Sequence, residues 1–132
     1  MTGHPASQDL LAQALRACAR GIYPDEAAIE LIIAHGTFLH RDDFTRHIIT
    51  SEYGHRGSMT VHAAIDWAAA LSAGALPCSS GEKRILHLAA SLATGLPADL
   101  RDTMTGLDHR NLALAIDALM HASGQRPPHL GP

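Results

Sequence analysis

Residues 24–36 read Pro-Asp-Glu-Ala-Ala-Ile-Glu-Leu-Ile-Ile-Ala-His-Gly, and this stretch decides the fold. Proline at the start of a helix loses no hydrogen bond, and the two acidic residues that follow it face the positive end of the helix dipole. Little of the helix surface is polar, because it carries Ile29, Leu31, Ile32 and Ile33. The stretch therefore predicts a central helix that ends at Gly36.

The rest of the chain repeats these signals: an apolar stripe at helical spacing, followed by a glycine that accepts a positive φ at little cost. Alanine and leucine are abundant and valine occurs once, so intrinsic propensity favours helix almost throughout. The remaining segments are a first helix capped by Ser7, a third from about 41–43, a loop at 51–58, a fourth helix over about 60–73, a fifth after Ser79, a short helix or connector at 97–104 and a last helix capped by Asp108. Helix ends are predicted at Gly21, Gly36, Gly74, Gly95 and Gly124.

Two helices have a buried side that the spacing defines closely. The first helix is predicted to bury Leu10, Leu11, Ala14, Leu15 and Cys18, and the last helix to bury Leu112, Ala115, Ile116 and Leu119. The fifth helix has the clearest start, because Ser79 and Glu82 fit a capping box in which each side chain accepts a hydrogen bond from the other residue's backbone amide.

These elements predict an all-α fold, a compact single-domain bundle of five or six helices that is essentially free of strands. We expect residues 1–124 to form the helical domain and residues 125–132, which contain three prolines, to be a flexible tail.

Composition narrows the class of protein. The chain has 132 residues, 46% hydrophobic and 17% charged, which is typical of one globular domain. Its net charge is −3 and its ten Lys and Arg residues are scattered, which argues against a nucleic-acid partner. The two cysteines form no Cys-x-x-Cys motif, and no apolar run is long enough for a membrane span. We expect a cytoplasmic protein with reduced thiols.

A resemblance to other proteins rests on several short blocks of sequence. They are His35-Gly-Thr-Phe-Leu39 with Asp43-Phe44, and Leu76-Pro-Cys-Ser-Ser-Gly-Glu82 followed by Leu100-Arg-Asp102 and Thr105-Gly-Leu-Asp108. In these blocks the chain resembles a group of uncharacterised small helical proteins from GC-rich actinobacteria, over most of residues 22–124. The resemblance implies a bacterial, intracellular origin and brings no activity, ligand or catalytic residue with it.

Ten histidines make the chain histidine-rich, and histidine is both a frequent ligand of transition metals and the side chain that titrates near neutral pH. Asp43 and His47, His62 and Asp66, and Asp117 and His121 are each four residues apart, a spacing that places both side chains on one face of a helix. A site for a divalent transition metal such as zinc would need ligands from several helices, and the candidates are His40, Asp43, His47 and His62. A solvated surface pair is the simpler interpretation of each spacing.

Two single residues have alternative interpretations. His35 ends the central helix, where a protonated imidazole would be favoured by the helix dipole; a catalytic role is the alternative interpretation. Trp67, with Tyr53 and Phe38, is either part of the core or an aromatic anchor for a partner.

No catalytic constellation is present in the sequence, so the leading hypothesis is a small helical binding or regulatory module that acts through another protein or through self-association. The alternative is a His/Asp metal-binding protein, with hydrolase activity as one form, whose site lies in residues 35–62. A transcription-associated DNA-binding protein is the third hypothesis.

Overall fold

The computed structural model describes residues 5–53, 61–72, 74 and 76–125. Within these ranges it contains seven α-helices, one 3₁₀ turn and two strands. The elements in chain order are α1 (Pro5–Ala19), α2 (Tyr23–His35), η1 (Phe38–His40), α3 (Asp42–His47), β1 (Ile49–Tyr53), β2 (Val61–Ile65), α4 (Trp67–Leu71), α5 (Ser80–Thr94), α6 (Leu100–Thr105) and α7 (His109–Ala122). The predicted compact helical class is confirmed.

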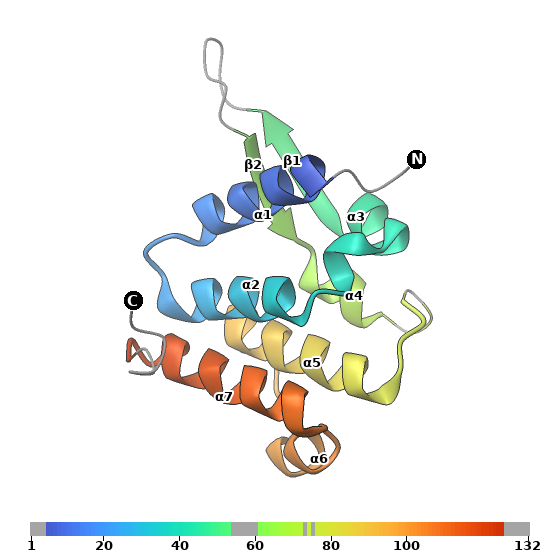
Figure 1. The fold of residues 1–132 in the computed structure, drawn as a ribbon, viewed down its shortest axis with the longest axis vertical. Helices are drawn as coiled ribbons and strands as arrows, with labels where there is room; N and C mark the ends of the chain where they lie inside the picture. The colour runs from blue at the N-terminus through green and yellow to red at the C-terminus, as the bar shows by residue number, and fades with distance from the viewer. Residues whose placement is uncertain (1–4, 54–60, 73, 75, 126–132) are drawn as a thin grey trace.

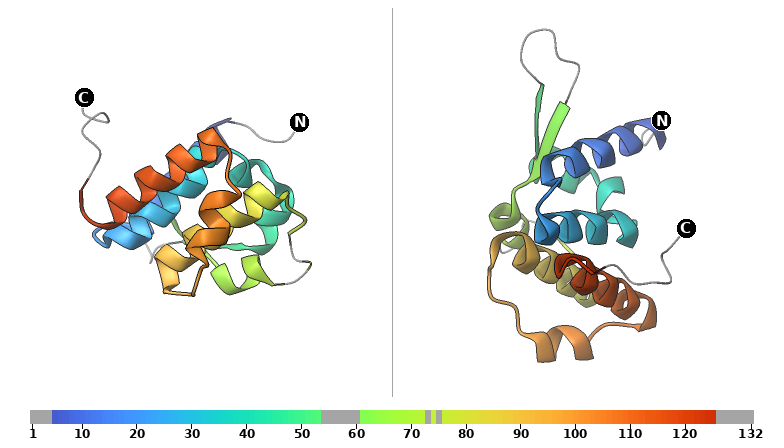
Figure 2. Two further views of the ribbon diagram at one scale, coloured as in Figure 1. Left: turned by 90° about the horizontal axis from the view of Figure 1, so that it is seen from below. Right: turned by 90° about the vertical axis from the view of Figure 1, so that its left-hand side faces the viewer.

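The elements are stacked in layers about α2. Figure 1 shows α1 and the two strands at one end of the molecule, α2 in the middle, and α5 with α7 beyond it. The short helix α6 lies at the opposite end from the strands, and the right-hand view in Figure 2 shows the same order. Helix α2 packs against α1, α5 and α7, so it is central, as its apolar sequence predicts.

The core runs along α2 because its side chains are buried on more than one side. Its buried residues are Ala27, Ala28, Ile29, Leu31, Ile32 and His35. The core cluster that surrounds them includes Leu15 of α1, Phe38 of η1, Phe44 of α3, Ile85 of α5 and Ala115 of α7. One continuous core therefore holds the helices and the strands together.

The predicted fourth helix is wrong in its first half. Residues 61–65 form β2, which pairs antiparallel with β1 so that Ile49 lies opposite Ile65. Ala63 and Ile65 are buried while His62 and Ala64 are exposed, so this segment has the two-residue alternation of a strand. The helical part begins only after Asp66, whose carboxylate accepts a hydrogen bond from the Ala69 amide at 3.0 Å.

Four of the five predicted helix ends are correct: Gly36 and Gly95 are the C-caps of α2 and α5, and Gly21 and Gly124 follow the last residues of α1 and α7 by two positions. The prediction for Gly74 is wrong, because α4 ends at Leu71 and its C-cap is Ser72. All five glycines named above have positive φ, between 77° at Gly74 and 95° at Gly21, and they are the only residues of the described ranges with such a φ. The capping box of α5 is also present: the Ser79 hydroxyl accepts from the Glu82 amide at 3.2 Å, and the Glu82 carboxylate accepts from the Ser79 amide at 2.9 Å.

The first helix differs in detail from its prediction. It begins at Pro5, so Ser7 is the third residue of the helix and not the residue that precedes it. Ala12, Ala14, Leu15 and Ala19 are buried, whereas Leu10 and Cys18 are exposed. The buried side of α1 is therefore rotated from the one that the sequence predicts.

Arginine side chains tie neighbouring helices at their ends. Arg84 of α5 donates to the Asp102 carbonyl of α6 at 3.1 Å and lies against Gly106, where there is no room for a Cβ atom. Arg110 of α7 donates to the carbonyls of Ala34 and His35, both at 3.1 Å, and so caps the C-terminus of α2. The Ala34 and His35 carbonyls are among those that the end of α2 leaves unpaired, whereas the Asp102 carbonyl also accepts from the Gly106 amide at 3.2 Å.

The capping box gives a direct test of the local structure. We expect Ser79→Ala to lower the free energy of unfolding by about 0.5–2 kcal/mol, because the Glu82 amide loses its acceptor. Ser80→Ala is the matched control and should cost less, since the Ser80 hydroxyl is not part of the box. Urea unfolding of both variants measures the difference, and a larger loss for Ser80→Ala would contradict the assignment.

Candidate functional site

The four predicted metal ligands lie on different elements. His40 ends η1, and its Nδ1 lies 2.7 Å from the amide nitrogen of the Gln8 side chain. Asp43 is in α3, where its carboxylate accepts two hydrogen bonds from Arg41, at 2.6 Å and 3.0 Å. His47 is the last residue of α3 and is exposed, and His62 is exposed on β2.

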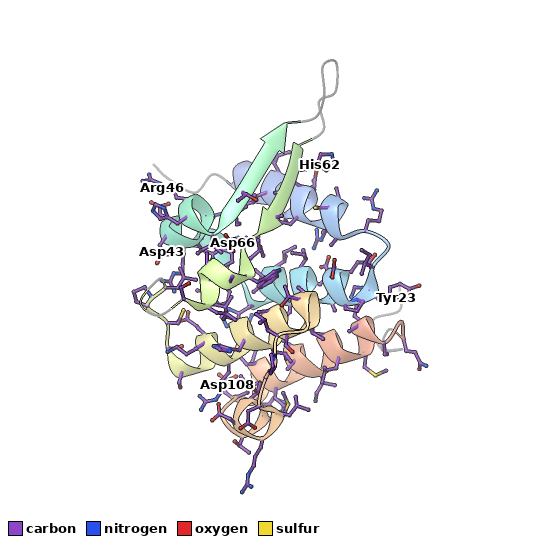
Figure 3. The ribbon with its side chains drawn as sticks, turned by 180° about the vertical axis from the view of Figure 1, so that it is seen from behind. Tyr23, Asp43, Arg46, His62, Asp66 and Asp108 are labelled. Atoms are coloured by element: carbon purple, nitrogen blue, oxygen red, sulfur yellow. The ribbon has the colours of Figure 1, made fainter. Side chains whose placement is uncertain are left out.

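The structure does not bring these four side chains together. Figure 3 shows Asp43 on α3 and His62 on β2 in separate parts of the molecule. His62 is in a strand, so its spacing to Asp66 no longer places the two side chains on one helix face. Among the described ranges, no group of three or more His, Cys, Asp or Glu side chains could hold a metal ion. His55 lies outside the described residues, and the metal site stays a prediction.

Asp43 already has a cationic partner. The Arg41 guanidinium holds the pKa of the Asp43 carboxyl below its usual value by hydrogen bonding and by its charge. A metal ion at Asp43 would have to compete with this ion pair.

The pair Asp117 and His121 was also predicted from its spacing. His121 has a partner on another helix, because its Nε2 lies 2.9 Å from a carboxylate oxygen of Glu26 on α2. The contact joins the end of α7 to the start of α2, while Arg110 joins the opposite ends, so the two helices run antiparallel.

His35 does not have the role predicted for it. It is 7% exposed, and its Nδ1 has no hydrogen-bond partner among the described residues. Burial and the nearby Arg110 charge lower its pKa, and the carboxylates of Glu82 and Asp108 oppose this only in part. Near neutral pH, His35 is therefore an uncharged imidazole in the folded protein. The guanidinium of Arg110 caps this helix end, where a protonated His35 was expected.

This environment makes stability depend on pH. Since the pKa of His35 is lower in the folded than in the unfolded protein, the unfolded state binds a proton more readily in mild acid. Stability from this group is complete at high pH and falls as the pH drops below the unfolded value of about 6.5.

We expect His35→Leu to reduce the loss of unfolding free energy between pH 7.5 and pH 5, measured by urea titration at both pH values. His109→Ala, which removes an exposed histidine, should leave the parent's loss unchanged. An equal loss in His35→Leu and in the parent would show that His35 does not carry this dependence.

The strongest departure from the sequence prediction lies on α7. Ile116 and Leu119 were predicted to be buried, but their exposed fractions are 50% and 40%. The buried residues of α7 are Ala115 and Ala118, which lie on the side that packs against α2 and α5. Small side chains there allow close approach of the neighbouring helices, and the larger apolar residues are left on the outside.

We define the α7 outer face as Leu112, Ala113, Ile116, Leu119 and Met120. The spacing of these five residues places them in one stripe along the helix. Ala113, Ile116 and Leu119 are exposed, and the other two are half-buried. All five are uncharged, with His109 before the stripe and Ser123 after it.

An exposed aromatic ring lies at the C-terminal end of α7. Tyr23, the first residue of α2, is 55% exposed, and its ring is 3.1 Å from where a Cβ atom at Gly124 would lie. The neighbouring Ile22 is also 55% exposed.

Of the two interpretations of Trp67 and Phe38, the structure confirms the core. Phe38 is fully buried and Trp67 is 9% exposed, and both belong to the core cluster, so neither is an aromatic anchor. The side chain of Tyr53 lies outside the part of the chain that is described. The large exposed apolar side chains Ile116 and Leu119 are on α7, and not on the elements that carry Phe38 and Trp67.

Comparison of the chain with protein-family models, with curated proteins and with solved structures gives no match. In the described part of the chain, none of the helices has the length and apolar character needed to cross a membrane.

Proposed function

We propose that this protein is a small helical interaction module whose docking surface is the α7 outer face. The observation that supports the proposal is the exposure of Ile116 and Leu119, large apolar residues in a stripe that no described part of the chain covers. A helix in an outer layer normally presents polar residues to solvent, and apolar residues on both sides indicate burial against a further surface.

The partner we propose is a second copy of this chain. Ile116 is the midpoint of the stripe from His109 to Ser123, so two α7 helices packed antiparallel about a two-fold axis would meet at Ile116. Leu112 and Ala113 of one copy would then face Leu119 and Met120 of the other, which is the reciprocal pairing of a symmetric dimer. Because the α7 outer face is uncharged, such pairing brings no like charges together and buries no unpaired charge.

The proposal keeps the cytoplasmic location predicted from the sequence. Cys18 and Cys78 are both free cysteines, which fits a reducing compartment.

Substitution of the central stripe residues tests the function. We expect the parent to form dimers at high micromolar concentration in sedimentation equilibrium, and Ile116→Asp and Leu119→Asp to be monomeric, since each would bury a carboxylate without a partner. Leu10→Asp is the matched control: Leu10 is 65% exposed on α1, away from α7, and the variant should dimerise like the parent.

A cross-link tests the geometry separately. With Cys18 and Cys78 replaced by serine, Ile116→Cys should form a disulfide-linked dimer on oxidation, because the two copies of residue 116 meet at the axis. A parent that stays monomeric over the whole concentration range, or dimers unaffected by Ile116→Asp, would overturn the proposal.

A further inference from the structure

A second surface feature lies apart from the α7 outer face. A pocket of about 480 Å³ is formed between α5 and the segment that leads into α6. Lys83, Arg84 and His87 of α5 line one side, Asp99, Asp102 and Thr103 the other, and Pro97 and Ala98 add apolar surface. Its volume is within the range of sites for small molecules.

Three hydrogen-bond donors that line this pocket, the side chains of Lys83, His87 and Thr103, have no partner among the described residues. Thr103 is 4% exposed, and its hydroxyl makes no hydrogen bond with the described residues. Lys83 and His87, four residues apart on α5, likewise form no hydrogen bond or ion pair within the described ranges. Because these three donors have no acceptor within the described part of the protein, a ligand acceptor in the pocket could bind them without breaking an existing contact.

The carboxylates of the pocket, in contrast, already have partners. Asp102 forms an ion pair with Arg84 at 3.4 Å, and Asp99 accepts a hydrogen bond from the Asp102 amide at 3.1 Å as the N-cap of α6. Arg84 is also held by the Asp102 carbonyl and by its packing on Gly106. The groups left to bind a ligand are therefore donors, one of them the positive charge of Lys83.

We propose that this pocket binds a small organic anion through its carboxylate or phosphate group. The anionic oxygens would accept from the Lys83 ammonium, the His87 imidazole and the Thr103 hydroxyl, and the remainder of the molecule would lie against Pro97 and Ala98. The oxygens of a carboxylate or phosphate can accept hydrogen bonds from these unpartnered donors. The positive charge of the Lys83 ammonium compensates the negative charge of the ligand.

Three six-carbon probes separate the possible head groups: glucose 6-phosphate, gluconate and the neutral glucose. We expect at least one of the two anions to shift the backbone NMR signals of residues 83, 87 and 103 in a saturable titration, and glucose to shift none of them. If neither anion shifts these signals at millimolar concentration, or if glucose shifts them equally, the proposal is overturned.

Variants then test the contacts with whichever anion binds. Lys83→Gln should raise its Kd about tenfold, since it removes a charge-assisted hydrogen bond. Thr103→Val, which keeps the shape of the buried side chain, should raise the Kd several-fold. Arg101→Gln is the matched control on the exposed side of α6 and should bind like the parent. Circular dichroism checks that each variant is folded, and unchanged binding by folded Lys83→Gln would contradict the assigned contacts.

Discussion

The structure depends on the burial of α2 on several sides. Leu31 is 2% exposed and Ile32 is fully buried, and each such side chain contributes about 1.5–3 kcal/mol relative to an exposed one. A helix with so little polar surface needs apolar neighbours in more than one direction. Helix α1 supplies them from one side and α5 with α7 from the other, which produces the layered arrangement in Figure 1.

The proposed function follows from the outermost of these layers. Helix α7 packs against α2 through alanine side chains. Its large apolar side chains are therefore left on the side that faces solvent. Arg110 and His121 hold α7 in this orientation at its two ends, through the α2 carbonyls and through Glu26. Rotation of α7 to bury Ile116 would break both contacts, so a further surface is the simpler way to cover it.

The start of α5 and most helix ends were predictable because they depend on local chemistry. The Ser79–Glu82 box and the five glycines with positive φ are set by residues adjacent in the chain. The strand at 61–65 was missed because Val61, Ala64 and Ile65 also fit a helical period, and pairing with residues 49–53 is not visible in a spacing pattern. Asp66, a strong N-cap residue, is the signal that could have placed the helix start correctly.

The two surfaces proposed to bind a partner and a ligand were harder to predict than the fold. Spacing finds which residues share a helix face, but the face that α2 covers depends on how α7 is rotated, so Ile116 and Leu119 were assigned to the core. The pocket between α5 and α6 likewise depends on tertiary packing, which no local motif records. Of the four proposed metal ligands, Asp43 and His47 share α3, and the structure places the other two on separate elements.

Native-state hydrogen exchange tests the central place of α2 most directly. If α2 organises the core, the amides of residues 27–33 should exchange only through global unfolding, with a free energy equal to that from urea titration. Amides of α6 and of the two strands, which lie at opposite ends of the molecule, should exchange through smaller openings. Faster exchange in α2 than in α1 or α7 would contradict the account.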